Sequence, residues 1–259
     1  YRQAGLEAGD QVALGISGSF PGLAIAALSA ATEMGLEARC IVSYGASTFG
    51  ATRPELTVPR MLRILREEHL LTYNLLAVSP GGDDDAGAGG LYEHTPQVIM
   101  ALAAQEDAPL IEEGDLAANI QRRMALYGDD VACFVNVGGA TANLGEGMHS
   151  LDFPPGLVVD PPPIPDSPTR GLIYEYAARG VPVIHLLNLR KLTMDHGLPF
   201  DPAPLPEPGS SAVYYRKAGQ PLLLAGTLAL AGVVLYLGYR ADKRRRAAAT
   251  NEAPLQPPL

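Results

Sequence analysis

The chain has 259 residues, of which 47% are apolar and 18% are charged, and its formal net charge is −9. So large an apolar fraction excludes a disordered chain. A charged fraction below the usual value of about a quarter indicates that part of the chain is not in water. Its two cysteines cannot form a disulfide scaffold or a four-cysteine zinc site. The acidic balance argues against non-specific nucleic-acid binding, which depends on lysine and arginine.

Charge is distributed unevenly along the sequence. Residues 240–246 hold five of the 19 basic residues, and residues 240–259 hold two of the 28 acidic residues. Residues 1–239 therefore carry 14 basic and 26 acidic side chains, a net charge of −12. The sequence thus predicts an acidic body followed by a basic tail, and its length suits one α/β domain plus appendages.

Apolar runs and helical patterns alternate through the body. We expect strands at residues 11–16, 38–43, 75–79, 131–137 and 183–187. We expect helices between them, at residues 23–34, 58–70, 95–105, 114–127 and 171–179. This alternation predicts an α/β fold in which helices flank a mostly parallel sheet. Residues 154–168 are rich in proline, and we expect an irregular loop there.

Residues 221–239 contain no charged side chain and one threonine, and as a helix they span roughly 28 Å, close to the hydrocarbon thickness of a bilayer. Five basic residues follow this segment and two precede it, so the positive-inside rule predicts a cytoplasmic tail and an extracytoplasmic body at the cell membrane. The alternative is a buried core helix, which rarely runs this long without a polar face.

Four parts follow from these patterns. We expect residues 1–198 to form the extracytoplasmic α/β domain and residues 199–220 to form a proline-rich spacer. We expect residues 221–239 to span the membrane and residues 240–259 to form a disordered basic tail. Because the sequence begins with Tyr1 rather than methionine, we also expect an upstream region that is missing from it.

Three loops rich in glycine, serine and threonine, at residues 17–22, 45–50 and 138–145, each follow a predicted strand. In a parallel sheet they lie along the carboxyl edge, where open α/β sheets build ligand sites. Their backbone N–H groups and the following helix N-terminus suit an anion such as phosphate or carboxylate. The alternative is that any α/β domain needs small residues where strands turn into helices. The ligand-binding candidates are Ser17, Gly18, Ser19, Gly45, Ser47, Thr48, Gly138, Gly139, Thr141 and Asn143.

Most known catalytic motifs are absent. The sequence has no P-loop, no dinucleotide-binding glycine motif after the first strand and no paired-histidine zinc motif, so no cofactor is evident. Ser17 or Ser19 could act as a nucleophile, with His149 or His185 as its base. The alternative for His185, which lies inside an apolar strand, is a core histidine with satisfied hydrogen bonds.

An acidic loop and two isolated cysteines complete the set of reactive side chains. Asp83, Asp84 and Asp85 could bind a divalent cation through hard oxygen ligands, or they could supply the acid of a serine triad. The alternative is a solvated acidic loop. Cys40 and Cys133 lie on predicted strands, and we expect them to pack as small apolar residues.

Several short motifs lie at strand ends. Gly-Ser-Phe-Pro at residues 18–21 precedes an alanine-rich helix, and Ser-x-Gly-Ala-Ser follows at residues 43–47. Later pieces are Gly-Gly-Asp at 81–83, Asn-Val-Gly-Gly at 136–139, Val-Ile-His-Leu-Leu-Asn at 183–188 and Gly-Leu-Pro-Phe-Asp-Pro at 197–202, ahead of an anchor. Through these motifs, residues 1–205 resemble the poly-γ-glutamate system protein family. The resemblance implies a role in making or exporting poly-γ-glutamate, an anionic capsule-like polymer, and a first membrane segment upstream. It implies no catalytic residue.

The expected function is that of a membrane-anchored accessory component of poly-γ-glutamate biosynthesis or export, with the other synthesis and export subunits as partners. A body of charge −12 repels an anionic polymer, so direct binding needs a basic patch, such as Arg53, Arg60, Arg63 and Arg66, or Arg122 and Arg123. An assembly role avoids that conflict. The alternatives are an extracytoplasmic hydrolase or transferase acting on the polymer, and a small-anion binding module without catalysis.

Overall fold

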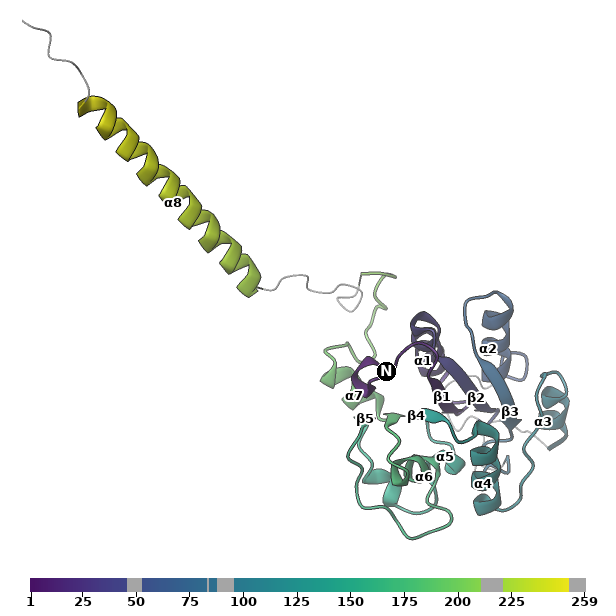
Figure 1. The fold of residues 1–259 in the computed structure, drawn as a ribbon. Helices are drawn as coiled ribbons and strands as arrows, with labels where there is room; N and C mark the ends of the chain where they lie inside the picture. Colours follow the sequence, from purple (N-terminus) through teal and green to yellow (C-terminus); the bar gives the residue numbers. More distant parts are fainter. Residues whose placement is uncertain (46–52, 83, 88–95, 211–220, 252–259) are drawn as a thin grey trace, which may run out of the picture. The chain divides into compact units, whose positions relative to one another are not determined.

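A computed structural model describes residues 1–45, 53–82, 84–87, 96–210 and 221–251. Contacts divide the chain into two compact units, Tyr1–Phe200 and Asp201–Leu259. The first unit contains every strand of the described sheet, and the second contains one long helix (Figure 1). The boundary between the units falls two residues after the predicted end of the α/β domain.

A six-stranded sheet with the order β3-β2-β1-β4-β6-β5 forms the centre of the first unit. Its strands are β1 (Gln11–Ile16), β2 (Glu37–Ser43), β3 (Asn74–Ser79), β4 (Val131–Val137), β5 (Gly156–Val158) and β6 (Val183–Leu186). All neighbours pair in parallel except β5, which is antiparallel to β6. The predicted α/β class with a mostly parallel sheet is therefore confirmed.

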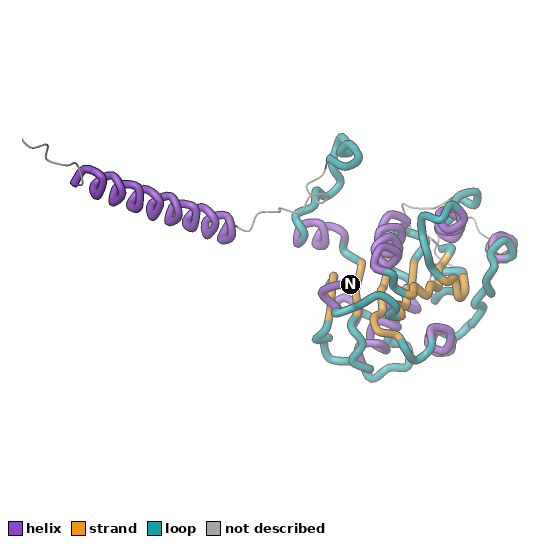
Figure 2. The backbone as a smooth tube through the Cα atoms, turned by 45° about the horizontal axis from the view of Figure 1, so that its top comes forward, coloured by secondary structure: helices purple, strands orange, loops and turns teal. Residues whose placement is uncertain are grey.

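Helices cover both faces of this sheet (Figure 2). Side chains of α1 (Pro21–Met34), α2 (Val58–Glu67) and α3 (Pro96–Ala103) pack in one buried cluster with alternate strand residues such as Leu14. Side chains of α4 (Leu116–Tyr127), α5 (Thr141–Leu144) and α6 (Leu172–Ala178) pack with the other strand residues, such as Ala13, on the opposite face. Because both faces are covered, the strands read as apolar runs rather than as alternating patterns.

Aromatic side chains fill the core of the second face. The Phe134 and Tyr176 rings stack with their centroids 4.8 Å apart, and Tyr127 meets both rings edge-on. The Tyr127 hydroxyl donates a hydrogen bond to the Leu14 carbonyl oxygen over 2.8 Å, so its polar end is satisfied inside the core. Cys40 and Cys133 are free and buried, as we expected.

One short strand and two short α-helices were not predicted. β5 lies within the proline-rich segment expected to be an irregular loop, and its three residues are too few to show any alternation. The helix α5 has four residues and α7 (Leu189–Asp195) has seven, so they are about one and two turns long. α7 begins at Asn188, whose backbone is left-handed with φ 60° and whose side chain accepts a hydrogen bond from the Lys191 N–H.

The second unit contains α8 (Pro221–Asn251), within which residues Leu224–Ala247 are long and apolar enough to cross a membrane. Large apolar side chains are exposed along this helix, among them Leu224, Leu230 and Leu235. The helix continues through the basic residues to Asn251, so the expectation of disorder is wrong for residues 240–251. Arginine and alanine, which dominate that stretch, are both strong helix formers, and this accounts for the difference.

Candidate functional site

The order of the strands places a switch point between β1 and β4. Chain order runs from β1 outward to β3 on one side, then returns to β4 and continues outward on the other side. In open α/β sheets, ligand sites form at the carboxyl ends of the strands beside such a switch point. The loops that begin at Ser17 and Gly138 follow these two strands directly, so the structure brings the first and third predicted loops together.

Close backbone contacts join the loops at this carboxyl edge. A Cβ atom at Gly18 would lie 2.5 Å from the Tyr44 carbonyl oxygen, and one at Gly45 would lie 2.6 Å from the Gly82 nitrogen. Real Cβ contacts are never this short, so both positions require glycine. The loops after β1, β2 and β3 therefore pack directly against one another through their backbones.

The loop after β4 joins the same packed region. Gly138 has φ 88°, and a Cβ there would lie 2.5 Å from the Phe20 ring and 2.9 Å from Ser17 Cβ. The Thr141 hydroxyl donates a weak hydrogen bond of 3.4 Å to the Gly82 carbonyl oxygen. We call this contact region of the four strand-end loops, residues 17–20, 44–45, 80–82 and 138–141, the loop junction.

Several N–H groups of the loop junction are already occupied. The N–H groups of Ser17, Gly45 and Gly138 donate to the carbonyl oxygens of Val137, Pro80 and Leu186, respectively. These three groups cannot also bind an anion without breaking bonds within the fold. Close packing explains why glycine stands at positions 18, 45 and 138 without any ligand, which is the alternative given above.

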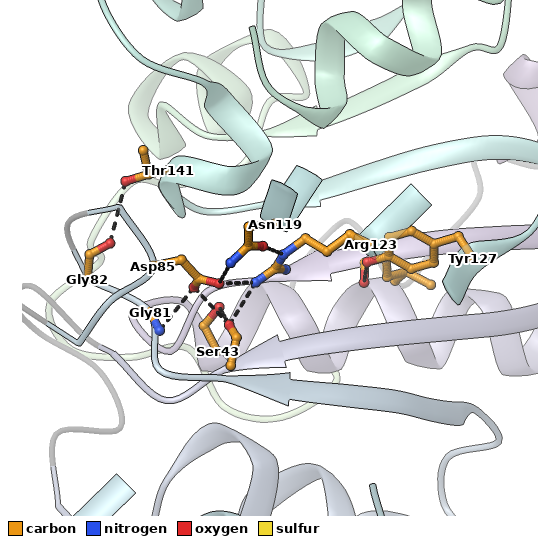
Figure 3. Close-up of polar contacts among 10 residues, drawn as sticks. Ser43, Gly81, Gly82, Asp85, Asn119, Arg123, Tyr127 and Thr141 are labelled. Atoms are coloured by element: carbon orange, nitrogen blue, oxygen red, sulfur yellow. Dashed lines mark hydrogen bonds and ion pairs between the residues drawn. The ribbon is translucent and has the colours of Figure 1, made fainter. Parts of the chain in front are cut away.

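A buried ion pair lies beneath the loop junction on the face covered by α4 (Figure 3). Arg123 Nη2 lies 2.5 Å from Asp85 Oδ2, and the two side chains are 1% and 0% exposed. Arg123 also donates to the Asn119 side-chain oxygen over 2.7 Å and to Ser79 Oγ over 2.8 Å. A buried charge pair of this kind needs such additional hydrogen bonds to offset its desolvation.

The remaining oxygen of Asp85 is satisfied in the same way. Asp85 Oδ1 accepts hydrogen bonds from Ser79 Oγ over 2.8 Å and from the Gly81 N–H over 3.0 Å. Ser43 Oγ lies 2.8 Å from Ser79 Oγ, which extends the network across β2 and β3. Asp85 therefore connects the acidic glycine loop to the sheet and to α4.

A second buried network lies across β4 and β6. Asn136 Nδ2 lies 2.8 Å from the Gly138 carbonyl oxygen and 3.0 Å from His185 Nδ1, and Asn143 Nδ2 donates to Asn136 Oδ1 over 2.9 Å. Because the Gly138 carbonyl only accepts, the orientation of the Asn136 amide is fixed, and His185 Nδ1 must accept. The neutral His185 ring consequently carries its proton on Nε2.

Burial keeps His185 neutral. The side chain is 2% exposed and its ring meets Phe153 edge-on, with the centroids 5.7 Å apart. Desolvation lowers the pKa of His185 from 6.5 to about 4. This geometry agrees with the interpretation of His185 as a core histidine with a satisfied hydrogen bond.

The predicted catalytic residues are not brought into one arrangement by the described part of the chain. Ser17 is buried, and its Oγ accepts a hydrogen bond of 3.4 Å from the Ser19 N–H. No hydrogen bond joins Ser17 to either histidine among the described residues. His149 is exposed in a short 3₁₀ turn, where its carbonyl oxygen accepts from the Tyr174 hydroxyl.

The remaining ligand candidates have varied positions. Gly139 and Asp84 are exposed, whereas Asn143 is buried with its side chain over Gly15 on β1. Asn143 Oδ1 has no hydrogen-bond partner among the described residues. Ser47, Thr48 and Asp83 lie outside the residues that the structure describes.

Asp85 is not available as a ligand for a divalent cation. Both of its carboxylate oxygens are engaged by Arg123, Asn119, Ser79 and the Gly81 N–H. Within the described ranges, no group of three or more histidine, cysteine, aspartate or glutamate side chains could hold a metal ion.

Some members of the basic patches proposed for polymer binding are engaged within the fold, whereas Arg53, Arg60 and Arg122 are exposed. Arg123 is fully buried in its pair with Asp85, so it cannot contact a polymer. Arg63 lies 3.4 Å from Glu106 and 3.9 Å from Glu67, and Arg66 stacks over the Tyr73 ring at 5.2 Å. Burial raises the pKa of Glu106, whereas the charge of Arg63 opposes that shift.

Sequence reasoning missed Asn119 and Asn136 and placed Arg123 on the surface. The buried side of α4 consists of Leu116, Asn119, Ile120, Arg123, Met124 and Tyr127. This spacing of three and four residues places Arg123 on the apolar face of the helix. The same spacing can be seen in the sequence, and it predicts that Arg123 is buried.

Two cavities lie away from the loop junction. One of about 590 Å³ lies at the opposite edge of the sheet, beside Gly35 at the end of α1 and Glu37 and Asn74 at the starts of β2 and β3. The other, of about 260 Å³, lies between Leu23, Leu157 and α7. Neither is lined by residues of the three predicted loops.

No protein-family model, no curated protein and no solved structure matches this chain. Its function is therefore inferred from its own residues and from the motifs described above.

Proposed function

We propose that this protein is a membrane-anchored accessory component of poly-γ-glutamate synthesis or export, and that its α/β domain acts by assembly with the other subunits. Its partners in this proposal are the subunits that synthesise the polymer and those that carry it across the membrane. The exposed apolar helix is the observation that carries the anchoring. The motifs at the strand ends support the assignment to this polymer system.

The surface of α8 supports the anchor. Leu224, Leu228 and Leu230 are 65%, 65% and 66% exposed, and none of the candidate span Leu224–Ala247 is buried within the protein. A contiguous apolar surface of this length is unfavourable in water but favourable in hydrocarbon. The helix also satisfies its own backbone hydrogen bonds, as a bilayer requires.

The basic residues set the orientation. Five basic side chains follow the apolar segment at residues 240–246, against Arg216 and Lys217 before it. By the positive-inside rule, residues 240–259 lie in the cytoplasm and the α/β domain lies outside. A reporter enzyme fused after Leu259 tests this directly. Activity only in the cytoplasm is expected, and activity outside the cell reverses the orientation.

The pieces that carry the resemblance are neighbours in space. The motif at 18–21 packs against the start of the motif at 43–47 through Gly18 and Tyr44. Gly81 and Gly82 pack on Gly45, and residues 136–139 contact both Phe20 and His185. Residues distant in the sequence thus form one structural unit, the loop junction with the strands beneath it.

Assembly fits the electrostatics better than polymer binding. The body carries a net charge of −12, and the buried or ion-paired state of Arg123 and Arg63 leaves these two cations unsuited to a polyanion. Docking against other subunits needs no attraction for the polymer itself.

Co-purification from cells that make the polymer tests the proposal. The full chain is isolated in mild detergent beside a variant that ends before Pro221, and bound proteins are identified by mass spectrometry. We expect the polymer ligase and the membrane export subunits with the full chain and less of them with the shortened variant. Recovery of neither subunit contradicts the proposal.

A serine substitution tests the enzymatic alternative. If the domain trimmed or released the polymer through Ser17 or Ser19, the double variant Ser17→Ala, Ser19→Ala would change polymer length or yield. If the domain acts only by assembly, polymer length and yield in the variant equal those in cells with the unaltered chain. A longer polymer in the variant would favour the hydrolase.

A further inference from the structure

The basic end of α8 has two different sides. On a helix, residues three and four apart lie on the same face, so Arg240, Lys243 and Arg244 face one way. Each residue turns the helix by about 100°, so the side chain of Arg245 lies on the opposite side of the helix axis from this face. Three of the five cations are therefore concentrated within one turn, on one face.

On the opposite side of the helix, an acidic residue neutralises part of the positive charge. Asp242 lies 2.9 Å from Arg246 Nε in an i,i+4 ion pair, with side chains 58% and 82% exposed. Asp242 is the only acidic residue between residues 240 and 246, and its charge is directed toward Arg246 rather than toward the other face. The face of Arg240, Lys243 and Arg244 therefore keeps its full positive charge.

An aromatic residue marks the membrane end of the same face. The Arg240 guanidinium lies over the Tyr236 ring, 5.8 Å from its centroid, in a cation–π contact between residues four apart. Tyrosine favours the boundary between hydrocarbon and headgroups. This contact places Arg240 immediately beyond that boundary when α8 spans a bilayer.

The depth of the cations matches that of lipid phosphates. Residues 221–239 extend for roughly 28 Å, which accounts for the hydrocarbon core of about 30 Å. From Arg240 to Arg244 the helix rises about 6 Å, within the headgroup layer that follows the hydrocarbon. A soluble polymer would have to enter that layer to reach the same side chains.

We propose that Arg240, Lys243 and Arg244 form a binding face for the phosphate of an anionic phospholipid. The proposal rests on the membrane-spanning role of α8 proposed above. Arginine donates to phosphate oxygens in a two-pronged arrangement, and lysine adds a point charge beside it. The face would hold an anionic lipid beside the helix and fix its rotation in the membrane.

The test compares two variants that remove the same charge from opposite faces. Lys243→Gln with Arg244→Gln removes two cations from the proposed face, and Arg245→Gln with Arg246→Gln removes two from the other. Both variants keep three basic residues, so the orientation signal remains. The full chains are reconstituted in phosphatidylcholine nanodiscs containing a minor fraction of phosphatidylglycerol, and the lipid retained after mild extraction is measured by mass spectrometry.

We expect the unaltered chain and the Arg245, Arg246 variant to retain phosphatidylglycerol in excess of its share. The Lys243, Arg244 variant should lose that enrichment, so that it retains phosphatidylglycerol only in proportion to its share of the nanodisc lipid. Equal losses in the two variants would show diffuse attraction and overturn the proposal. Displacement of the lipid by inorganic phosphate, or preferential retention of added poly-γ-glutamate, would also overturn it.

An alkaline wash of native membranes separates this proposal from the anchoring proposal. All three chains should stay in the membrane pellet. If the unaltered chain is washed off, the membrane-spanning role fails. If it stays but shows no lipid enrichment, only the lipid-binding face fails.

Discussion

Arg123 on α4 forms a buried ion pair with Asp85 in the acidic glycine loop, with Nη2 and Oδ2 2.5 Å apart. The pair joins a segment of positive φ, at 53° for Asp84 and 60° for Asp85, to a helix and two strands. Removal of one partner leaves an uncompensated charge in the core. The pair therefore holds the loop after β3 in place at the loop junction.

Asp85→Asn should lower the free energy of unfolding by about 3–5 kcal/mol. The neutral amide leaves the charge of Arg123 uncompensated, and its NH2 group must face either Arg123 and Asn119 or the Gly81 N–H, all of which are donors. Asp84→Asn is the matched control, because Asp84 is exposed and asparagine tolerates its left-handed backbone. Urea unfolding of both variants, followed by circular dichroism, measures the difference, and equal stability would show that the ion pair does not hold the loop.

Gly138→Ala should destabilise the domain by about 1–3 kcal/mol, because the added methyl group would overlap Phe20 and because φ is 88°. Gly139→Ala serves as the control, since nothing lies within 4 Å of its added Cβ. Thermal unfolding of the two full-length variants distinguishes them. A melting temperature for Gly138→Ala equal to that of the control would mean that the close packing around Gly138 is wrong.

Acid should weaken the fold through His185. Because burial lowers its pKa to about 4, the folded state holds the neutral ring, whereas the unfolded chain takes up a proton below pH 6.5. The free energy of unfolding therefore falls as the pH drops from about 6.5 to about 4, by roughly 3 kcal/mol at most, and no further below that. His185→Gln cannot take up this proton and should lose less stability over the same range. Parallel pH profiles for the two proteins would refute this assignment.

Cys40 and Cys133 should be unreactive in the folded protein. Both are fully buried, and desolvation raises the pKa of each thiol, that of Cys133 to about 12. Since the thiolate is the reactive form, a thiol reagent should label neither cysteine in buffer and both in denaturant. Labelling is counted by intact mass, and rapid modification in buffer would contradict the buried positions.

Long apolar runs made most of the sheet predictable. β1 and β4 have the predicted boundaries, because apolar runs of six or seven residues between turns suit strands buried on both faces. β5 could not be found, since its three residues form a strand only by pairing with β6. The continuation of the helix after Tyr239 was not predicted, because the tail contains prolines and shows no periodic pattern, although arginine and alanine favour helix.

The candidate site was predictable in its location but not in its chemistry. Strand ends of a parallel sheet meet at one edge, so the loops at Ser17 and Gly138 had to converge. The partners of Asp85 could not be found in the same way, because Arg123 lies 38 residues away and its burial depends on tertiary packing. The spacing of Asn119 and Arg123 among the apolar residues of α4 is the sequence feature that indicates a buried polar network.

Polymer production in cells tests the central claim most directly. The gene is deleted in a strain that makes poly-γ-glutamate, and surface polymer is measured with and without the full chain supplied in trans. The proposed function predicts loss of surface polymer on deletion, recovery with the full chain, and little recovery with a chain that ends before Pro221. Unchanged surface polymer in the deletion strain would contradict it.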